Sequence, residues 1–271
     1  MRIALLTLEA LASAVPVRTL VANYPDMIAF VGLSDPYRPQ QGGMMGQTVR
    51  FLKQSGPRLL PYMIANFSLP RIAGLLPRRY RTPGGTPMAA LCAAHAIPVE
   101  IVPDMNAAAF HSRLIKSGAN LILTFHCDQI LTGATIGCLP GGALNVHAGL
   151  LPDHRGPAPT IHALLDDKPR LGVTIHRMVP RIDAGPILVQ QELSLPATTS
   201  ALEAATALHM HAVPLLMDVL NGIEAGTAIE VVTEPLPYCG FPSPAQLRRL
   251  REMGRRAASW RDLLRAIRTP V

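Results

Sequence analysis

Short apolar runs alternate with stretches of helical periodicity along this sequence. The runs consist mainly of Ile, Val, Leu, Ala and Phe, and their apolar residues are continuous rather than alternating with polar ones. Such runs are typical of strands buried on both faces, which occur in parallel sheets covered by helices. The first five predicted strands are Arg2–Leu8, Met27–Leu33, Pro98–Val102, Leu121–Phe125 and Ala143–Val146. The alternation predicts an α/β fold with an open, mostly parallel sheet and helices on both faces.

The helical patterns lie between and after these runs. The shorter predicted helices are Pro87–His95, Ala107–Ser117 and Ala158–Leu165. Two longer apolar runs, Gly172–Met178 and Ile187–Leu195, are predicted as further strands. A long helix over Ser200–Leu220 is expected to end at Gly222, because glycine is favoured just past a helix C-terminus.

The segment from about residue 37 to residue 86 interrupts this alternation. It is rich in proline and glycine, carries apolar clusters between basic residues, and has no acidic residue. We predict that it is an insertion within one α/β domain spanning residues 1–240. Three interpretations fit: an irregular loop with its apolar side on the domain, a homodimer contact, or short amphipathic helices on an anionic membrane surface or a lipid-linked substrate.

Residues 241–271 are predicted to form a basic helical tail. From Pro244 to Val271 there are eight arginines against two acidic residues, Glu252 and Asp262. A solvated basic helix and a helix that meets phosphates both fit this composition. The two basic segments together carry more positive charge than the net +7 of the whole chain, so the remaining residues are acidic on balance. Aromatic residues are only 4% of the chain, and we predict no specific nucleic-acid partner.

The N-terminus and the cysteines favour a cytoplasmic protein. Residues 2–14 faintly resemble a signal peptide, but Glu9 interrupts the apolar run, so a first strand is the better interpretation. The four cysteines are far apart without CxxC spacing, which is typical of reduced thiols. No apolar stretch approaches the ~18 residues of a membrane span. Peripheral attachment at the inner membrane surface, through residues 37–86, remains an option.

Polar residues that can carry chemistry follow the fifth predicted strand. Asn145 and His147 are two apart, so both project from one face at the carboxyl end of a buried strand, where open α/β sheets bind ligands. Asp183 lies in a later loop between Pro180 and Gly185. An amide can donate to an oxyanion, an imidazole can move a proton, and a carboxylate can orient the imidazole. These groups suffice for acyl transfer to an amine, although a hydrogen-bonded core pair fits the spacing at least as well.

Two stretches resemble the signatures of the folate-dependent formyltransferases. The first reads Asn145-Val-His147, then Leu150-Leu151-Pro152, His154-Arg155-Gly156 and Pro159. The second reads Gly172-Val-Thr-Ile-His, then Ile182-Asp183-Ala-Gly185-Pro186-Ile-Leu. The chain is thereby identified as a member of a family that includes methionyl-tRNA, glycinamide ribonucleotide and sugar formyltransferases. The resemblance covers about residues 120–226 and implies an open Rossmann-like fold.

The resemblance also implies an enzyme of one-carbon metabolism with 10-formyltetrahydrofolate as its formyl donor. Asn145 would hold the formyl oxygen, His147 would act as general acid and base, and Asp183 would position His147 and a water. The donor would bind at Asp128, Gln129, Ile130, Leu131, Val179, Pro180, Arg181 and Ile182. His154 and Arg155 would either contact the acceptor or fix their own loop. We expect no metal ion.

Features missing from the sequence restrict the range of possible acceptor substrates. No glycine follows the first predicted strand between Thr7 and Ala14, which argues against a phosphate cradle there. The residues after Gly226 are too few for the C-terminal β domain of methionyl-tRNA enzymes. We therefore predict a primary amine of a small molecule, a sugar or a lipid-linked compound as the acceptor. Alternatives are a hydrolase that releases formate, a methionyl-tRNA formyltransferase-like enzyme lacking the C-terminal domain, and a folate-binding protein without activity.

Overall fold

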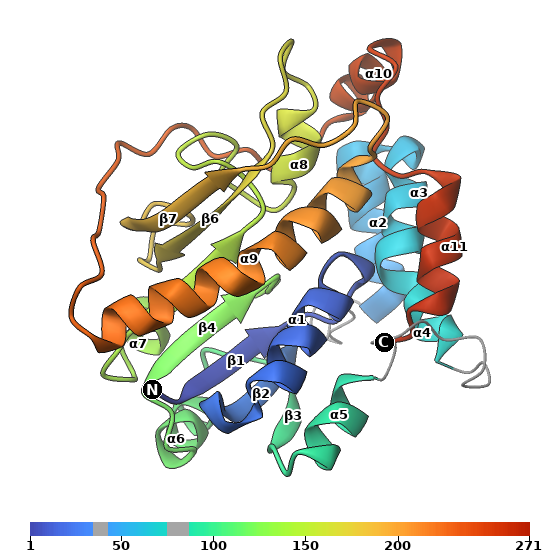
Figure 1. Ribbon diagram of the computed structural model, residues 1–271. Helices are drawn as coiled ribbons and strands as arrows, with labels where there is room; N and C mark the ends of the chain where they lie inside the picture. The colour runs from blue at the N-terminus through green and yellow to red at the C-terminus, as the bar shows by residue number, and fades with distance from the viewer. Residues whose placement is uncertain (35–42, 75–86) are drawn as a thin grey trace.

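The computed structural model describes residues 1–34, 43–74 and 87–271 and contains one seven-stranded sheet in the order β3-β2-β1-β4-β5-β6-β7 (Figure 1). Its parallel strands are β1 (Ile3–Thr7), β2 (Ile28–Ser34), β3 (Val99–Val102), β4 (Leu121–Phe125) and β5 (Ala143–His147). The hairpin of β6 (Gly172–Arg177) and β7 (Ile187–Glu192) extends the sheet beside β5 in the antiparallel direction. The predicted open, mostly parallel sheet is confirmed.

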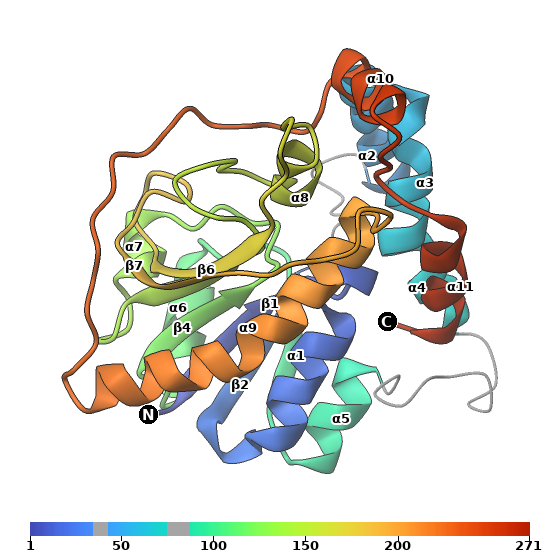
Figure 2. The same ribbon diagram turned by 45° about the horizontal axis from the view of Figure 1, so that its top comes forward.

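Helices cover both faces of the sheet, as predicted (Figures 1 and 2). Successive side chains of a strand point to opposite faces. In β1, Ile3 and Leu5 accordingly join one core cluster and Ala4 and Leu6 join another. The first cluster is closed by α1 (Leu11–Asn23), α5 (Met88–Ala94) and α9 (Ala201–Glu224). The second is closed by α6 (Ala108–Lys116) and α7 (Gly133–Ile136).

Helix α1 was not predicted from the sequence. It contains Pro16, its N-cap residue Ala10 supplies no side-chain hydrogen bond, and most of its residues are buried. A helix that is buried on nearly every side lacks the apolar stripe that marks a surface helix. Packing against α9 and the sheet, rather than a local sequence signal, therefore stabilises α1.

Helix α9 ends later than predicted. Its N-terminus is the expected one, because the Ser200 hydroxyl accepts a hydrogen bond from the N–H of Glu203. The predicted end at Gly222 is wrong, since the helix continues to Glu224 and the residue with positive φ (70°) is Gly226. A glycine inside a helix costs only about 1 kcal/mol, and packing over the helix outweighs that cost.

The described part of the insertion is helical, so an irregular loop is the wrong interpretation for residues 43–74. Its elements are α2 (Gly43–Ser55), η3 (Pro57–Leu59), α3 (Leu60–Met63), the π-helix η4 (Ile64–Ser68) and α4 (Leu69–Ala73). Leu59, Tyr62 and Ala65 are buried in a third core cluster that also contains residues of α8 (Pro159–Ala163) and α9. The remaining residues of the insertion, 37–42 and 75–86, lie outside the described residues.

The C-terminal segment forms two helices, α10 (Pro244–Glu252) and α11 (Trp260–Arg268), separated at Gly254. Both contribute side chains to the third core cluster, which they share with the insertion and α9. The two views agree that α11 lies alongside α3 and α4 (Figures 1 and 2). The predicted helical tail is confirmed, while a domain boundary at residue 240 stays a prediction.

The strand order creates a switch point between β1 and β4. From β1 the chain proceeds to β2 on one side, and from β4 it proceeds to β5 on the other. The loops that leave the carboxyl ends of these two neighbouring strands therefore diverge. Open α/β sheets bind their ligands in the crevice that such loops leave.

Candidate active site

A cavity of about 330 Å³ lies at the carboxyl ends of β4 and β5. One wall consists of Thr124, residues 126–131 after β4, and residues 145–148 of β5 and its loop. Residues 156–160 and several residues between 176 and 183 form the next wall. The remaining lining residues come from distant parts of the chain: Ala12, Tyr62, Ala205, His209, Tyr238 and Phe241. The cavity thus lies at the predicted edge of the sheet.

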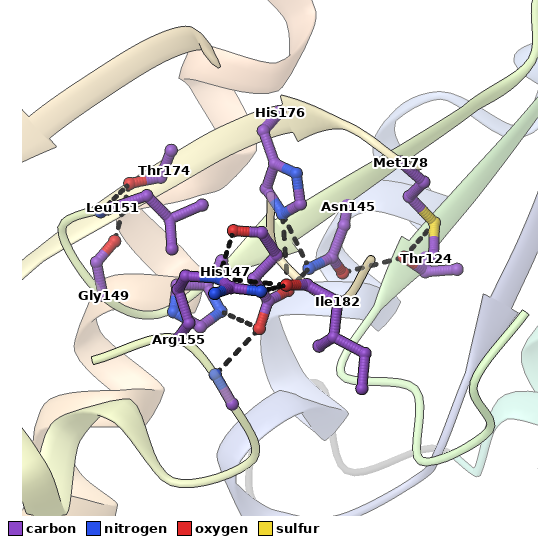
Figure 3. A network of polar contacts seen from close by, with 12 residues as sticks. Thr124, Asn145, His147, Gly149, Leu151, Arg155, Thr174, His176, Met178 and Ile182 are labelled. Atoms are coloured by element: carbon purple, nitrogen blue, oxygen red, sulfur yellow. Dashed lines mark hydrogen bonds and ion pairs between the residues drawn. The ribbon is translucent and has the colours of Figure 1, made fainter. Parts of the chain in front are cut away.

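The carboxylate of Asp183 contacts both other predicted catalytic residues. Figure 3 shows Asn145 and His147 in this network of polar contacts. Its Oδ1 accepts a hydrogen bond from Asn145 Nδ2 at 3.3 Å and lies 3.6 Å from His176 Nε2. Its Oδ2 accepts the N–H of Gly156 at 2.9 Å and lies 3.7 Å from His147 Nδ1. The fold therefore brings Asn145 and His147 of the β5 end together with Asp183 of the loop between β6 and β7.

The side-chain amide of Asn145 is held in one orientation. Its Oδ1 accepts the hydroxyl of Thr124 at 2.8 Å, and its Nδ2 lies 3.1 Å from His176 Nε2. His176 Nδ1 lies 2.8 Å from the carbonyl oxygen of Arg177, so Nδ1 carries the proton and Nε2 accepts from Asn145. His176 therefore positions Asn145, and the amide N–H groups face the carboxylate side of the cavity.

His147 has one ring nitrogen toward Asp183 and one without a partner. Nδ1 faces the carboxylate, while Nε2 is buried and makes no hydrogen bond to the described residues. Gly149 leaves room for the ring, because a Cβ at that residue would lie 2.9 Å from Nε2. Burial lowers the pKa of His147, although the nearby Asp183 carboxylate opposes this effect. The ring is thereby favoured in its neutral form, which can accept a proton.

The Asp183 carboxyl is stabilised as an anion. Burial alone raises its pKa, but His147, His176 and the N–H of Gly156 outweigh burial and lower the pKa from 3.8 to about 2. The backbone of Asp183 has φ of 46°, a left-handed conformation that an L-residue adopts at a cost of about 1 kcal/mol or more. Surrounding contacts must therefore hold this loop in place.

Arg155 supplies those contacts by donating hydrogen bonds to the backbone of the loop. Its guanidinium is buried and donates to the carbonyl oxygens of Ile182 and Asp183 through Nε, at 3.0 and 3.1 Å, and to Leu236 through Nη1. Nη2 also donates to Ile182. Arg155 does not line the cavity, so of its two predicted roles the geometry supports loop fixation.

The side chain of His154 also lies outside the cavity. Its Nε2 is 2.8 Å from Asp166 Oδ2, and its ring stacks on His162 with 14° between the planes. It lines a separate surface hollow with Asp166 and Arg249. The structure therefore gives no acceptor contact to this histidine.

Seven of the eight predicted donor-binding residues line the cavity: Asp128, Gln129, Ile130, Leu131, Val179, Pro180 and Ile182. Arg181 does not line it, and its side chain is exposed. The amide of Gln129 is turned inward, where it accepts the N–H of Met105 at 2.9 Å and donates to the carbonyl oxygen of Val102 at 2.8 Å. Gln129 thus ties the loop after β4 to the end of β3.

Besides His176, two further histidines of the cavity wall were not predicted as site residues. His126 adopts φ of 55°, lies 3.0 Å through Nδ1 from Ser13 Oγ, and stacks parallel to Phe67 of η4. His209 of α9 donates through Nδ1 to the carbonyl oxygen of Ala12 at 3.0 Å, and burial lowers its pKa to about 3. No pattern in the sequence links these positions, because α1, the insertion and α9 meet only in the folded chain.

Tyr62 of α3 completes this side of the cavity, and burial raises the pKa of its hydroxyl to about 12. Among residues 1–34, 43–74 and 87–271, no group of three or more His, Cys, Asp or Glu side chains is arranged to hold a metal ion. The described lining also contains no lysine or arginine. The cavity therefore presents neutral polar groups and two carboxylates, Asp128 and Asp183, within apolar walls.

Sequence comparison identifies relatives of this chain. The family described as formyl transferase matches residues 97–220. The methionyl-tRNA formyltransferase of Listeria welshimeri is 35% identical over 158 residues, which are 58% of this chain and 50% of that protein. The chain thus spans about half the length of this curated relative.

Comparison with solved structures extends the likeness to most of the chain. A sugar N-formyltransferase from Shewanella sp. FDAARGOS_354 aligns with a TM-score of 0.56 and 17% identity, over 89% of this chain and 77% of its own. Glycinamide ribonucleotide transformylase 1 from Symbiobacterium toebii aligns with a TM-score of 0.57 and 13% identity, over 86% of this chain and 94% of its own. At such identities these structures show a shared fold. Residues 97–220 of this chain are thus similar to the formyl transferase family.

Proposed function

We propose that this protein transfers a formyl group from 10-formyltetrahydrofolate to a primary amine, without a covalent enzyme intermediate. The observation that carries the proposal is the convergence of Asn145, His147 and Asp183 on the wall of one cavity. The family match supports the same reaction class. A sugar 3N-formyl transferase of the same fold (TM-score 0.54) was crystallised in the presence of dTDP and 5-N-formyl-THF, which supports a folate donor.

In the proposed reaction the amine nitrogen attacks the formyl carbon, and the bond from that carbon to the folate nitrogen breaks. An N–H of Asn145 stabilises the oxyanion, once its present contact to His176 or Asp183 is exchanged for the substrate oxygen. His147 takes the proton of the attacking amine and returns a proton to the folate nitrogen. Asp183 keeps His147 oriented and stabilises its cationic form.

The walls of the cavity suit a flat heterocyclic donor. Side chains of Ile130, Leu131, Val179 and Ile182 supply apolar surface, and the cavity volume lies in the usual range for small-ligand sites. The donor would lie between the loop after β4 and the loop before Asp183. In that position its formyl group would face Asn145 and His147.

The opposite side of the cavity favours a small acceptor without phosphate near its amine. Because the described lining offers no lysine or arginine, a phosphate would find no cationic partner there. His126, His209 and Tyr62 offer neutral hydrogen-bonding groups instead. We propose an amino sugar or another small amine as the acceptor. A lipid-linked amine remains compatible, and so does a tRNA-linked amine, because the listerial relative is a methionyl-tRNA enzyme.

Three variants test the mechanism: Asn145→Ala, His147→Ala and Asp183→Ala. Loss of one oxyanion donor costs on the order of 10²–10³ in turnover, so we expect Asn145→Ala to lose at least that much. The other two variants should lose most activity while keeping the far-UV circular dichroism of the wild type. Single-turnover assays with a panel of amines, read by mass spectrometry of the formylated product, measure the effect. Near-normal turnover by His147→Ala would contradict the mechanism.

A hydrolase is the second candidate, because water could reach the formyl carbon from the same side as an amine. Formate release measured with and without each amine separates the two activities. If formate appears at the same rate without any product of amine transfer, the protein is a hydrolase. His154→Gln serves as the control variant, since this side chain pairs with Asp166 away from the cavity.

A further inference from the structure

Helix α11 leaves an apolar stripe exposed on the surface. Trp260, Leu264 and Ile267 follow the i, i+4, i+7 spacing of one helix face and are 63%, 45% and 40% exposed. The buried residues of the same helix are Asp262 and Ala266. A third stripe, Arg261, Arg265 and Arg268, adjoins the apolar one. The helix therefore packs inward through a buried carboxylate and Ala266, and it leaves a separate apolar stripe on the outside.

The rotation of α11 about its axis is fixed by Asp262. The carboxylate oxygen Oδ2 accepts from Ser200 Oγ at 2.6 Å, from Ser259 N at 2.7 Å and from Ser259 Oγ at 2.8 Å. Ser200 is the N-cap of α9 and Ser259 is the N-cap of α11, so the aspartate joins the two helix ends. Because this anchor is fully buried, the stripe of Trp260 is held outward and cannot turn into the core.

The neighbouring helices of the insertion add exposed apolar side chains. Helix α4 and the π-helix η4 pack against α11, and both views of the ribbon show them side by side (Figures 1 and 2). Ile72 of α4 is 58% exposed and Ile64 of η4 is 41% exposed. We call Ile64, Ile72, Trp260, Leu264 and Ile267 the α4–α11 face.

The two segments that carry the α4–α11 face have exposed charges of one sign. Residues 57–74 contain Arg58 and Arg71 and no acidic residue. Residues 255–271 contain five arginines, and their single acid is the buried Asp262. Arg261 lies over the ring of Trp260, 5.8 Å from its centroid. An aromatic and aliphatic stripe beside arginines is the pattern of a helix that lies in the interface of an anionic membrane.

We propose that the α4–α11 face docks this protein onto the surface of an anionic lipid bilayer. Tryptophan and the aliphatic side chains would enter the headgroup region, and the arginines would pair with lipid phosphates. No helix within the described residues combines the length and apolar character needed to span a bilayer, so the contact is peripheral. The proposal is independent of formyl transfer and can hold or fail without it.

The sequence offers a direct probe, because Trp260 is the only tryptophan of the chain. The full-length protein is mixed with vesicles of phosphatidylcholine, with and without phosphatidylglycerol, at low salt. We expect flotation with the anionic vesicles only, together with a blue shift of the tryptophan emission and quenching by brominated lipid. Raising the salt concentration should release the protein, because surface electrostatics are screened.

Two variants and a control locate the contact. Leu264→Ser with Ile267→Ser keeps the fluorescent probe and should abolish the blue shift. Arg261→Gln, which keeps the ion pair of Arg265 with the buried Asp262, should weaken partitioning by roughly fivefold. The control replaces three exposed apolar residues of other regions, Ile115, Ile229 and Val232, by serine and should bind like the wild type.

Three results would overturn the proposal. The first is no flotation with anionic vesicles at low salt, and the second is flotation without any change in the Trp260 emission. The third is a doubled mass in light scattering that the Leu264→Ser, Ile267→Ser variant restores to the monomer value. That last result would make a second copy of the chain the occupant of the α4–α11 face.

Discussion

At the scale of single residues, Asp183 connects the parts of the candidate site. The same carboxylate accepts from the amide of Asn145 and the backbone of Gly156 and faces two imidazoles. Gly156 is required for this contact: its φ is 127°, and a Cβ there would lie 2.1 Å from the carbonyl oxygen of Cys239. A one-atom change at either position therefore disturbs several groups at once.

The lowered pKa of Asp183 predicts a pH dependence of stability. The folded-state pKa of about 2 lies below the ordinary value of 3.8, so the ionised carboxylate contributes stability above about pH 4 that disappears as pH falls through about 2. The contribution is on the order of 2 kcal/mol. We expect the difference in unfolding free energy between the wild type and Asp183→Asn to shrink over that range, as measured by urea denaturation.

The buried histidines begin to act at a higher pH, and the comparison removes the part of their contribution that does not depend on Asp183. Burial lowers the pKa values of His126, His147 and His209, so their neutral forms contribute stability that declines below the ordinary histidine pKa of about 6.5. Both proteins retain these histidines, so the contributions of His126 and His209 cancel in the difference. The contribution of His147 does not cancel, because Asp183 raises its pKa, and the Asp183 contribution is therefore measured below about pH 4. A difference that stays constant down to about pH 2 would show that the Asp183 pKa is not lowered.

At the scale of elements, the loop between β6 and β7 depends on a residue from another loop. Arg155 follows β5 and makes its hydrogen bonds to carbonyl oxygens of Ile182, Asp183 and Leu236. A lysine could not replace it, because an ammonium group lacks the planar fork that reaches several carbonyls. The loop between β6 and β7 thus holds Asp183 and the neighbouring cavity residues Val179, Pro180 and Ile182 in one fixed position.

We predict that Arg155→Met moves this unit without removing any catalytic group. A displacement of about 1 Å can cost roughly 10² in turnover, so we expect kcat to fall by about that factor and the KM for the folate donor to rise. His154→Gln is the matched control from the adjacent position and should leave both constants unchanged. If the two variants behave alike, Arg155 has no positioning role for the site.

At the scale of the whole molecule, the insertion and the C-terminal helices form one layer. Leu59 and Tyr62 of the insertion share the third core cluster with Leu247, Leu250 and Ala266 of the last two helices. Arg18 of α1 also donates to the carbonyl oxygen of Pro270 at 2.8 Å and pairs with Glu9. The basic tail is therefore packed onto the body through its apolar side, and its arginines lie mainly outward.

This packing predicts that the tail contributes to global stability. Leu250 is 2% exposed, and its truncation to alanine should cost about 2–5 kcal/mol of unfolding free energy. Leu264 of the same tail is 45% exposed, and Leu264→Ala should change stability by less than about 0.5 kcal/mol. Urea denaturation of both variants measures the contrast. Equal small effects would mean that the tail is not part of the cooperative unit.

Much of the fold was predictable because its signals are local. The parallel strands are buried on both faces, so each is a continuous apolar run, and Ser200 marks the start of α9 by its cap. The end of α9 and the whole of α1 were not predictable, because Gly222 and Pro16 are tolerated inside helices that long-range packing stabilises. Where a helix is extensively buried, packing outweighs the low helix propensity of single residues such as Gly222 and Pro16.

By itself, the sequence determined the strand that carries Asn145 and His147, the loop that carries Asp183, and the chemistry that these groups offer together. Only the tertiary structure decided which residues complete the cavity, since Ala12, Tyr62 and His209 lie on elements far apart in the chain. The tertiary structure also decided that Arg155 contacts the loop between β6 and β7 and that one apolar stripe of α11 faces outward. Spacing within a strand fixes the relative direction of two side chains, whereas contacts between elements depend on how the whole chain packs.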